Sequence, residues 1–131
     1  MRAVDTNVLV RYLVADDAAQ FRQARRVMES GAVFIGKSVL LETVWVLRRA
    51  FGIRPAYVLE VLEGLAGAAE VELEDRVAVV QAIEWSRGGM DFADALHVAS
   101  RGQASEFVTF DRGLAASARK AGVAGVVRLP G

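Results

Sequence analysis

The amino-acid sequence predicts an α/β fold, in which a central short-stranded parallel sheet is flanked by helices on both faces. Short apolar runs, such as residues 32–35 and 107–110, alternate along the chain with longer segments of helical periodicity. The short runs are continuously apolar, which is typical of strands covered on both faces. The length of 131 residues fits one domain, so we expect a single domain over residues 1–131.

Capping residues set the expected boundaries in the first part of the chain. Thr6 or Asn7 can cap a helix after the first strand, and Ser38 can cap the third helix, which Gly52 ends. Pro55 suits the first turn of the fourth helix. The expected elements here are strands at 3–4, 32–35 and 71–73 and helices at 6–13, 17–29, 39–51 and 55–66.

The same signals continue in the second part of the chain. Asp75 can cap a fifth helix, which Gly88 and Gly89 interrupt, and Asp91 directly precedes a sixth. The expected elements here are helices at 76–86, 92–101 and 114–120 and strands at 107–110 and 126–129.

The composition excludes several kinds of catalysis. The chain has no Cys and one His, which removes thiolate nucleophiles, Cys-based zinc sites and multi-His metal sites. Sixteen basic residues balance sixteen acidic ones, so there is no basic excess that would indicate nucleic-acid binding, although the balance does not exclude it. No uncharged stretch approaches the roughly 20 residues of a membrane span, and the N-terminus lacks a signal-peptide pattern, so we expect a cytoplasmic protein.

Four acidic residues occupy positions that indicate a metal site. Asp5 and Asp111 each directly follow an expected strand, at the sheet edge where parallel α/β folds bind ligands. Glu42 lies in a helix that is apolar almost all round and is expected to be buried, and Asp94 has apolar neighbours on both sides. Carboxylates that converge are stabilised by a divalent cation, and oxygen ligands without His or Cys suit Mg²⁺ or Mn²⁺. The chemistry that this favours is metal-assisted phosphodiester hydrolysis.

Each acid also has a purely structural explanation. Asp5 and Asp91 could cap helices, and for Asp91 the cap is the favoured interpretation. Asp111 could form a turn, Glu42 could pair with an Arg, and Asp94 could cap or pair locally. Four independent structural explanations are less economical than one shared site.

Four motifs in this order resemble the PIN-domain family, and in particular the VapC-type ribonuclease toxins of type II toxin–antitoxin systems. The matching segments are residues 4–9 (VDTNVL), 38–47 (SVLLETVWVL), 91–96 (DFADAL) and 108–111 (VTFD). Together they extend over essentially the whole chain. The resemblance implies a parallel sheet flanked by helices, a homodimer, and a cognate antitoxin that blocks the site.

The resemblance also assigns roles to individual residues. The acidic quartet of the family falls on Asp5, Glu42, Asp94 and Asp111, with Asp5 and Asp94 as the principal metal ligands. The residues expected to support these carboxylates are Thr6, Asn7 and Thr109, with Asp91 beside the quartet but outside its core set. His97 stands where the family often has an aliphatic residue, and a core or hydrogen-bonding role is favoured over that of a general base.

The sequence therefore favours an Mg²⁺-dependent endoribonuclease that is the toxin of an antitoxin pair. One alternative is a phosphatase of the phosphoaspartyl type with Asp5 as nucleophile, although Asn7 stands where a second acid is usual. A second alternative is a non-catalytic binding module. The basic residues that could contact RNA, or could simply form solvated helix faces, are Arg48, Arg49, Arg54, Arg112, Arg119 and Lys120. Residues 55–75 carry six acids and no base, and are expected to form a solvated face.

Overall fold

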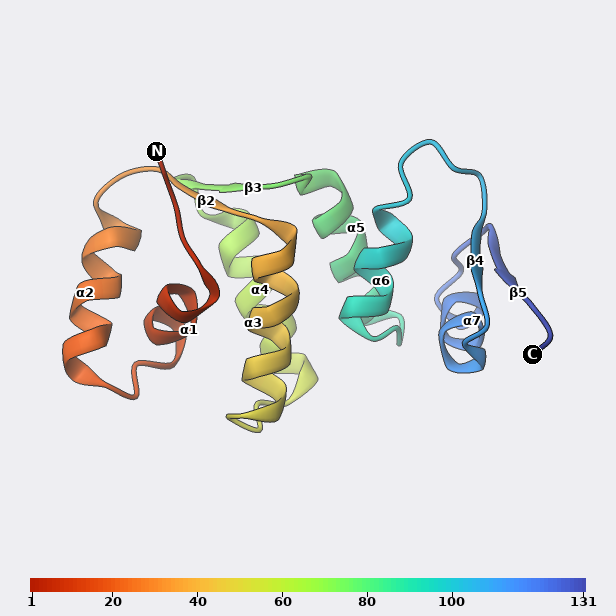
Figure 1. The fold of residues 1–131 in the computed structure, drawn as a ribbon, viewed down its shortest axis with the longest axis horizontal. Coiled ribbons are helices and arrows are strands. Elements are labelled where there is room, and N and C mark those ends of the chain that lie inside the picture. Colours follow the sequence, from red (N-terminus) through yellow and green to blue (C-terminus); the bar gives the residue numbers. More distant parts are fainter. The chain divides into compact units, whose positions relative to one another are not determined.

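The computed structural model describes residues 1–131 and contains seven helices and five short strands (Figure 1). The strands are β1 (Arg2–Ala3), β2 (Val33–Ile35), β3 (Val71–Leu73), β4 (Phe107–Thr109) and β5 (Val126–Arg128). The helices are α1 (Thr6–Val14), α2 (Ala18–Glu29), α3 (Lys37–Arg49), α4 (Pro55–Gly67), α5 (Arg76–Arg87), α6 (Phe92–Ala99) and α7 (Arg112–Lys120). None of the helices is both long and apolar enough to span a membrane.

Every strand pair is parallel, which confirms the predicted α/β class. The strands form two sheets, one in the order β1-β2-β3 and the other consisting of β4 and β5. In the first sheet Val33 of β2 pairs with both Arg2 and Val71, and in the second Thr109 pairs with Arg128. The chain divides into two compact units, Met1–Arg76 and Val77–Gly131, and each sheet belongs to one of them.

The core of the first unit consists of the apolar runs that the sequence identifies. Val33 and Ile35 of β2 are fully buried, as is Leu9 of α1. α1 packs against α2 and α3, and α4 packs against β3 and α3. In Figure 1 these four helices extend downward from the level of β2 and β3. The six acids expected on a solvated face between residues 55 and 75 are all exposed.

The second unit buries apolar residues from each of its three helices. Leu96 and Val98 of α6 are almost completely buried, together with Val79 of α5 and Ala118 of α7. β5 pairs with β4 and packs against α7, so the small sheet and this helix form one substructure.

Two expected capping residues are wrong, and α7 begins at Arg112 rather than at the expected residue 114. α1 is capped by Asp5 rather than by Thr6 or Asn7, because the Asp5 carboxylate reaches the amide of Val8. α3 begins at Lys37, so Ser38 lies inside the helix instead of capping it. The reason is long-range: Oε1 of Glu74, which follows β3, accepts a 2.8 Å hydrogen bond from the Lys37 amide and satisfies this helix end.

Candidate functional site

Asp5 forms the N-terminal cap of α1 at the point where the chain leaves β1. Its backbone is extended, with φ −92° and ψ 176°, and its Oδ1 accepts a 3.0 Å hydrogen bond from the amide of Val8. The sequence left a cap and a functional site open as alternatives, and the structure shows the cap. Capping uses only one carboxylate oxygen and fixes the direction of the side chain. Oδ2 of Asp5 therefore remains available to another group.

Glu42 is exposed on α3, which corrects the expectation of a buried helix. One face of α3 is buried through Leu40, Thr43 and Leu47, whereas Trp45 on another face is 61% exposed. The helix is amphipathic in its packing although its sequence is apolar almost all round. Because Glu42 lies outside the core, its ionised carboxylate does not carry the desolvation cost that a buried position would impose.

Thr6 connects Glu42 to the start of α1. Its Oγ1 donates a hydrogen bond of 2.5 Å to Oε1 of Glu42. Asp5 and Thr6 are adjacent in the chain, so this bond ties the Glu42 side chain to the residue next to the capping carboxylate. The supporting position predicted for Thr6 is thus matched by a direct contact.

A cleft of about 550 Å³ in the first unit is lined by both of its candidate carboxylates. Its polar lining residues are Asp5, Thr6, Asn7, Arg11 and Glu42, and the rest of the lining is apolar. Arg11 forms a salt bridge with Asp16. Asn7 is exposed and its side chain makes no hydrogen bond within the protein. The first unit therefore contributes two carboxylates, an amide and the Arg11 guanidinium group to one open cleft.

In the second unit two further acids, Asp91 and Asp111, interact electrostatically with Asp94. This residue lies in the first turn of α6 and is half-buried. Burial raises the pKa of the Asp94 carboxyl, and the negative charges of Asp91 and Asp111 raise it further, while His97 lowers it. Asp91 caps α6, since its Oδ2 accepts a 3.2 Å hydrogen bond from the Asp94 amide. The capping interpretation favoured for Asp91 is confirmed.

Asp111 caps α7 two residues after the end of β4. Its Oδ1 accepts a 3.0 Å hydrogen bond from the Leu114 amide, so it is a helix cap rather than only a turn residue. Oγ1 of Thr109, at the end of β4, accepts a 2.9 Å hydrogen bond from the Asp111 amide. Thr109 therefore fixes the backbone that carries Asp111. The contact is with the backbone amide of Asp111 and not with its carboxylate, which Thr109 was expected to support.

His97 does not have the core or hydrogen-bonding role that the sequence favoured. It is exposed on α6, and its imidazole makes no hydrogen bond within the protein. The buried residues of α6 include Ala95, Leu96 and Val98, whereas His97 lies on the solvent side of the helix. His97 acts on Asp94 through its charge alone.

The candidate donors in each unit suit a hard divalent cation. All candidate ligands are carboxylate oxygens, the type that Mg²⁺ and Mn²⁺ prefer. No group of three or more acidic or histidine side chains is arranged to hold a metal ion. Mg²⁺ often uses only one or two carboxylates and completes its shell with water and phosphate. The pairs present in each unit fit that requirement.

Comparison with protein families identifies the chain. A family profile described as PIN domain matches residues 2–120. The chain belongs to the PIN-domain family. The match extends over both units and includes all four acids of the quartet. Comparison with curated proteins and with solved structures found no significant match.

The PIN domain is a nuclease fold, and its members are typically metal-dependent hydrolases of nucleic acid. Membership in the PIN-domain family therefore supports the predicted class of reaction, the metal-dependent hydrolysis of nucleic acid. One cationic residue near the PIN-domain acids was missed by sequence reasoning, namely Arg128 of β5. The pairing of β5 with β4 places it beside Thr109. The sequence predicts both strands but gives no signal for the register that pairs Thr109 with Arg128.

Proposed function

We propose that the protein is an Mg²⁺-dependent endoribonuclease, with Mn²⁺ as an alternative ion, and that residues 1–131 act as one catalytic PIN domain. The observation that carries the proposal is the family match over residues 2–120, whose motifs include Asp5, Glu42, Asp94 and Asp111. These four carboxylates would hold the ion. When bound, a divalent ion activates water and neutralises charge on a phosphate that is being cleaved.

The residues of the chain contribute position and charge to this reaction. Asp5 and Asp111 are each held by a helix amide through one oxygen, which supports the use of the second oxygen as a ligand. Thr6 orients Glu42, and Thr109 orients the backbone of Asp111. Asp91 contributes through the α6 cap and through its charge, which acts on Asp94. These contacts reduce the reorganisation that ion binding requires.

The test is cleavage of RNA by the purified protein with Mg²⁺ or Mn²⁺, with sequencing of the product ends. Asp5→Asn and Asp94→Asn are expected to lower the rate by about 100-fold or more, because each removes a negatively charged ligand. Asp17→Asn is the matched control, since Asp17 caps α2 through the same kind of bond and lies outside the proposed site. A folded Asp5→Asn or Asp94→Asn protein that cleaves as fast as the parent would contradict the assignment.

We also propose a biological role as the VapC-type toxin of a type II toxin–antitoxin pair, acting in the cytoplasm. The support is the resemblance of the four motifs to that subgroup together with the small size of the chain. A homodimer and a cognate antitoxin that covers the carboxylates would be the partners. Expression of the protein alone should arrest growth, and co-expression of the neighbouring small reading frame should relieve the arrest. Unimpaired growth with active enzyme present would exclude the toxin role while leaving the nuclease proposal intact.

A further inference from the structure

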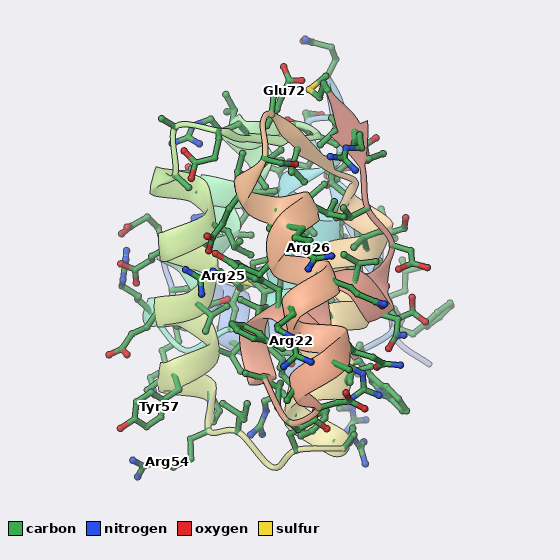
Figure 2. All side chains as sticks on the ribbon, turned by 90° about the vertical axis from the view of Figure 1, so that its left-hand side faces the viewer. Arg22, Arg25, Arg26, Arg54, Tyr57 and Glu72 are labelled. Carbon is green, nitrogen blue, oxygen red and sulfur yellow. The ribbon has the colours of Figure 1, made fainter.

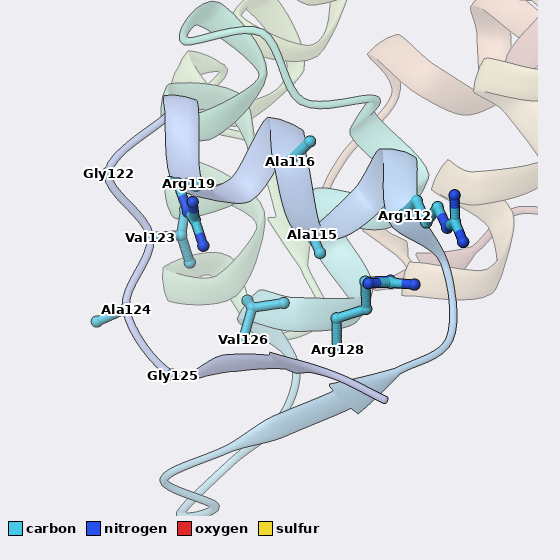
Figure 3. Close-up of a pocket in the computed structure, with 10 residues that line it drawn as sticks. All are labelled: Arg112, Ala115, Ala116, Arg119, Gly122, Val123, Ala124, Gly125, Val126 and Arg128. Atoms are coloured by element: carbon cyan, nitrogen blue, oxygen red, sulfur yellow. The ribbon is translucent and has the colours of Figure 1, made fainter. Parts of the chain in front are cut away.

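A second cleft, of about 990 Å³, lies entirely within the second unit and is cationic (Figure 3). Its charged lining residues are Arg112 and Arg119 of α7 and Arg128 of β5, and no acidic residue lines it. All three arginines are exposed, and none forms a salt bridge. The remaining lining residues are Ala, Val and Gly, which carry no charge that could neutralise the guanidinium groups. Such a surface favours an anionic ligand.

The arginines are spread along the cleft rather than gathered at one point. Arg112 and Arg119 are seven residues apart on α7, which corresponds to a rise of roughly 10 Å along the helix axis. Figure 3 shows them toward opposite ends of the cleft, with Arg128 on the facing strand near the Arg112 end. One phosphate group cannot engage both ends. A ligand that carries several phosphates in a row matches this spacing better.

The floor of the cleft is held in place by a series of hydrogen bonds. The backbone amides of Gly122 and Val123 donate to α7, at 3.0 and 2.9 Å. Arg101 donates to the carbonyl of Ala124 at 3.0 Å, and Gly125 accepts from the Phe107 amide at 2.8 Å. The loop from α7 to β5 is therefore tied at four consecutive residues, so the cleft is formed before any ligand enters it.

The cleft begins next to one of the proposed catalytic carboxylates of the same unit. Arg112 directly follows Asp111, and Arg128 pairs across the sheet with Thr109, whose hydroxyl accepts from the Asp111 amide. An RNA strand that is cut at Asp111 continues beyond the scissile phosphate. Its neighbouring phosphates need cations, because the acids of the site repel them.

We infer that the cleft between α7 and β5 binds the phosphate backbone of the RNA strand on one side of the scissile bond. The inference rests on the proposed nuclease function and adds the path of the substrate. Arg is suited to this task because its planar guanidinium can bind a phosphate through two parallel hydrogen bonds. No aromatic side chain lines the cleft, so it holds the backbone without stacking on bases. Part of the cleft, including Arg128, lies beyond the residues matched by the family.

The test measures the affinity for a fluorescein-labelled oligouridine by fluorescence anisotropy, in buffer with EDTA so that the RNA stays intact. Arg119→Ala and Arg128→Ala are expected to weaken binding about fivefold each. Each should also lower the slope of log Kd against log salt concentration by about 0.7, the value for one lost phosphate contact on a single strand. Thermal unfolding of each variant should match that of the wild type, since both side chains are exposed.

Arg22→Ala provides the matched control for net charge. Arg22 is exposed on α2, forms no salt bridge, and lies with Arg25 and Arg26 along that helix (Figure 2). Its loss should leave the affinity and the salt slope close to those of the wild type. An equal loss of affinity in Arg22→Ala and the cleft variants would overturn the inference, because it would show a response to charge alone.

Two further outcomes are decisive. If a polyglutamate peptide of equal charge displaces the RNA at the same concentration as unlabelled oligouridine, the cleft is a site for an acidic protein segment and the inference is overturned. If the wild type cleaves RNA but Arg119→Ala and Arg128→Ala bind as the wild type does, the inference fails while the nuclease proposal stands. If the wild type binds RNA through the cleft but cleaves none, the role of the cleft is supported and the nuclease proposal is overturned.

Discussion

The Thr6 hydroxyl donates a hydrogen bond of 2.5 Å to Oε1 of Glu42, a residue 36 positions further along the chain. This bond joins α1 to α3 at the cleft that Asp5 and Glu42 line. It connects a neutral donor to a carboxylate that would otherwise rotate freely in solvent. The geometry of Glu42 in this cleft thus depends on a residue that is not itself charged.

Thr6→Val keeps the shape of the side chain but removes the donor. We expect it to weaken Mn²⁺ binding and RNA cleavage by about tenfold, the lower end of the range for residues that orient metal ligands. Thr6→Ser, which keeps the hydroxyl, should stay near the wild type. Titration calorimetry with Mn²⁺ and single-turnover cleavage check the prediction. Equal affinities and rates in Thr6→Val and the wild type would show that Glu42 needs no such orientation.

Substitutions of the capping aspartates distinguish effects on stability from effects on catalysis. Asp111→Ala should lower the free energy of unfolding by about 1 kcal/mol, because the Leu114 amide at the start of α7 loses its acceptor. Asp111→Asn should keep most of that stability, since Asn caps nearly as well, and yet should lose cleavage. Asp17→Ala should lose similar stability at α2 and keep its catalytic rate. Urea unfolding and cleavage assays distinguish these cases, and a fully active Asp111→Asn protein would contradict the prediction.

The raised pKa of Asp94 gives a direction to the pH dependence of stability. Burial, and then Asp91 and Asp111, disfavour the ionised form in the folded protein. The contribution of the Asp94 carboxyl to the free energy of unfolding is therefore fully present below the ordinary pKa of aspartate. It is lost as the pH rises through the higher pKa that this carboxyl has in the folded state. In EDTA, Asp94→Asn should unfold at a higher temperature than the wild type at neutral pH, and the difference should shrink in acid.

With divalent ions present, the wild type should unfold at a higher temperature than Asp94→Asn. Mn²⁺ is expected to raise the unfolding temperature of the wild type but not that of Asp94→Asn, because ion binding to the folded state alone adds stability. Differential scanning calorimetry with and without the ion provides the measurement. If Asp94→Asn were less stable than the wild type in EDTA, the carboxylate would be contributing a structural bond rather than repulsion.

Gly125 should not tolerate a side chain. Its φ is +79°, and a Cβ there would lie 2.4 Å from the carbonyl oxygen of Ser105. Gly122 has a similar φ of +77° but open space around it. We expect Gly122→Ala to cost about 1–2 kcal/mol, the penalty for a left-handed backbone, and Gly125→Ala to cost clearly more because the clash is added. Equal losses in urea unfolding would show that the loop moves to relieve the contact.

Much of the fold was predictable because its signals are local. Pro55 begins α4 as expected, and the apolar runs at 33–35 and 107–109 are strands. The start of α3 was not predictable, because the carboxylate that satisfies the Lys37 amide comes from Glu74 on a distant segment. Hydropathy alone misplaced Glu42, since an apolar helix can still expose one face.

The candidate site was predictable as a set of residues but not as a geometry. Order along the chain identified the acids, and family membership agrees with it. The sequence left a cap for Asp5 and a turn for Asp111 open as alternatives to function, whereas both residues cap helices through one oxygen and keep the other available. No role for Arg128 could be predicted, because its place beside Thr109 depends on the register of β4 with β5.

The use of aspartate as a helix cap also has an evolutionary consequence. At positions 5 and 111, replacement by asparagine removes a negative charge but preserves the hydrogen bond that starts the helix. Selection for folding therefore does not oppose this replacement, and only selection for activity does. If that second selection were relaxed, inactive descendants of this chain would persist as well-folded proteins, with asparagine at these two positions as the trace of their origin.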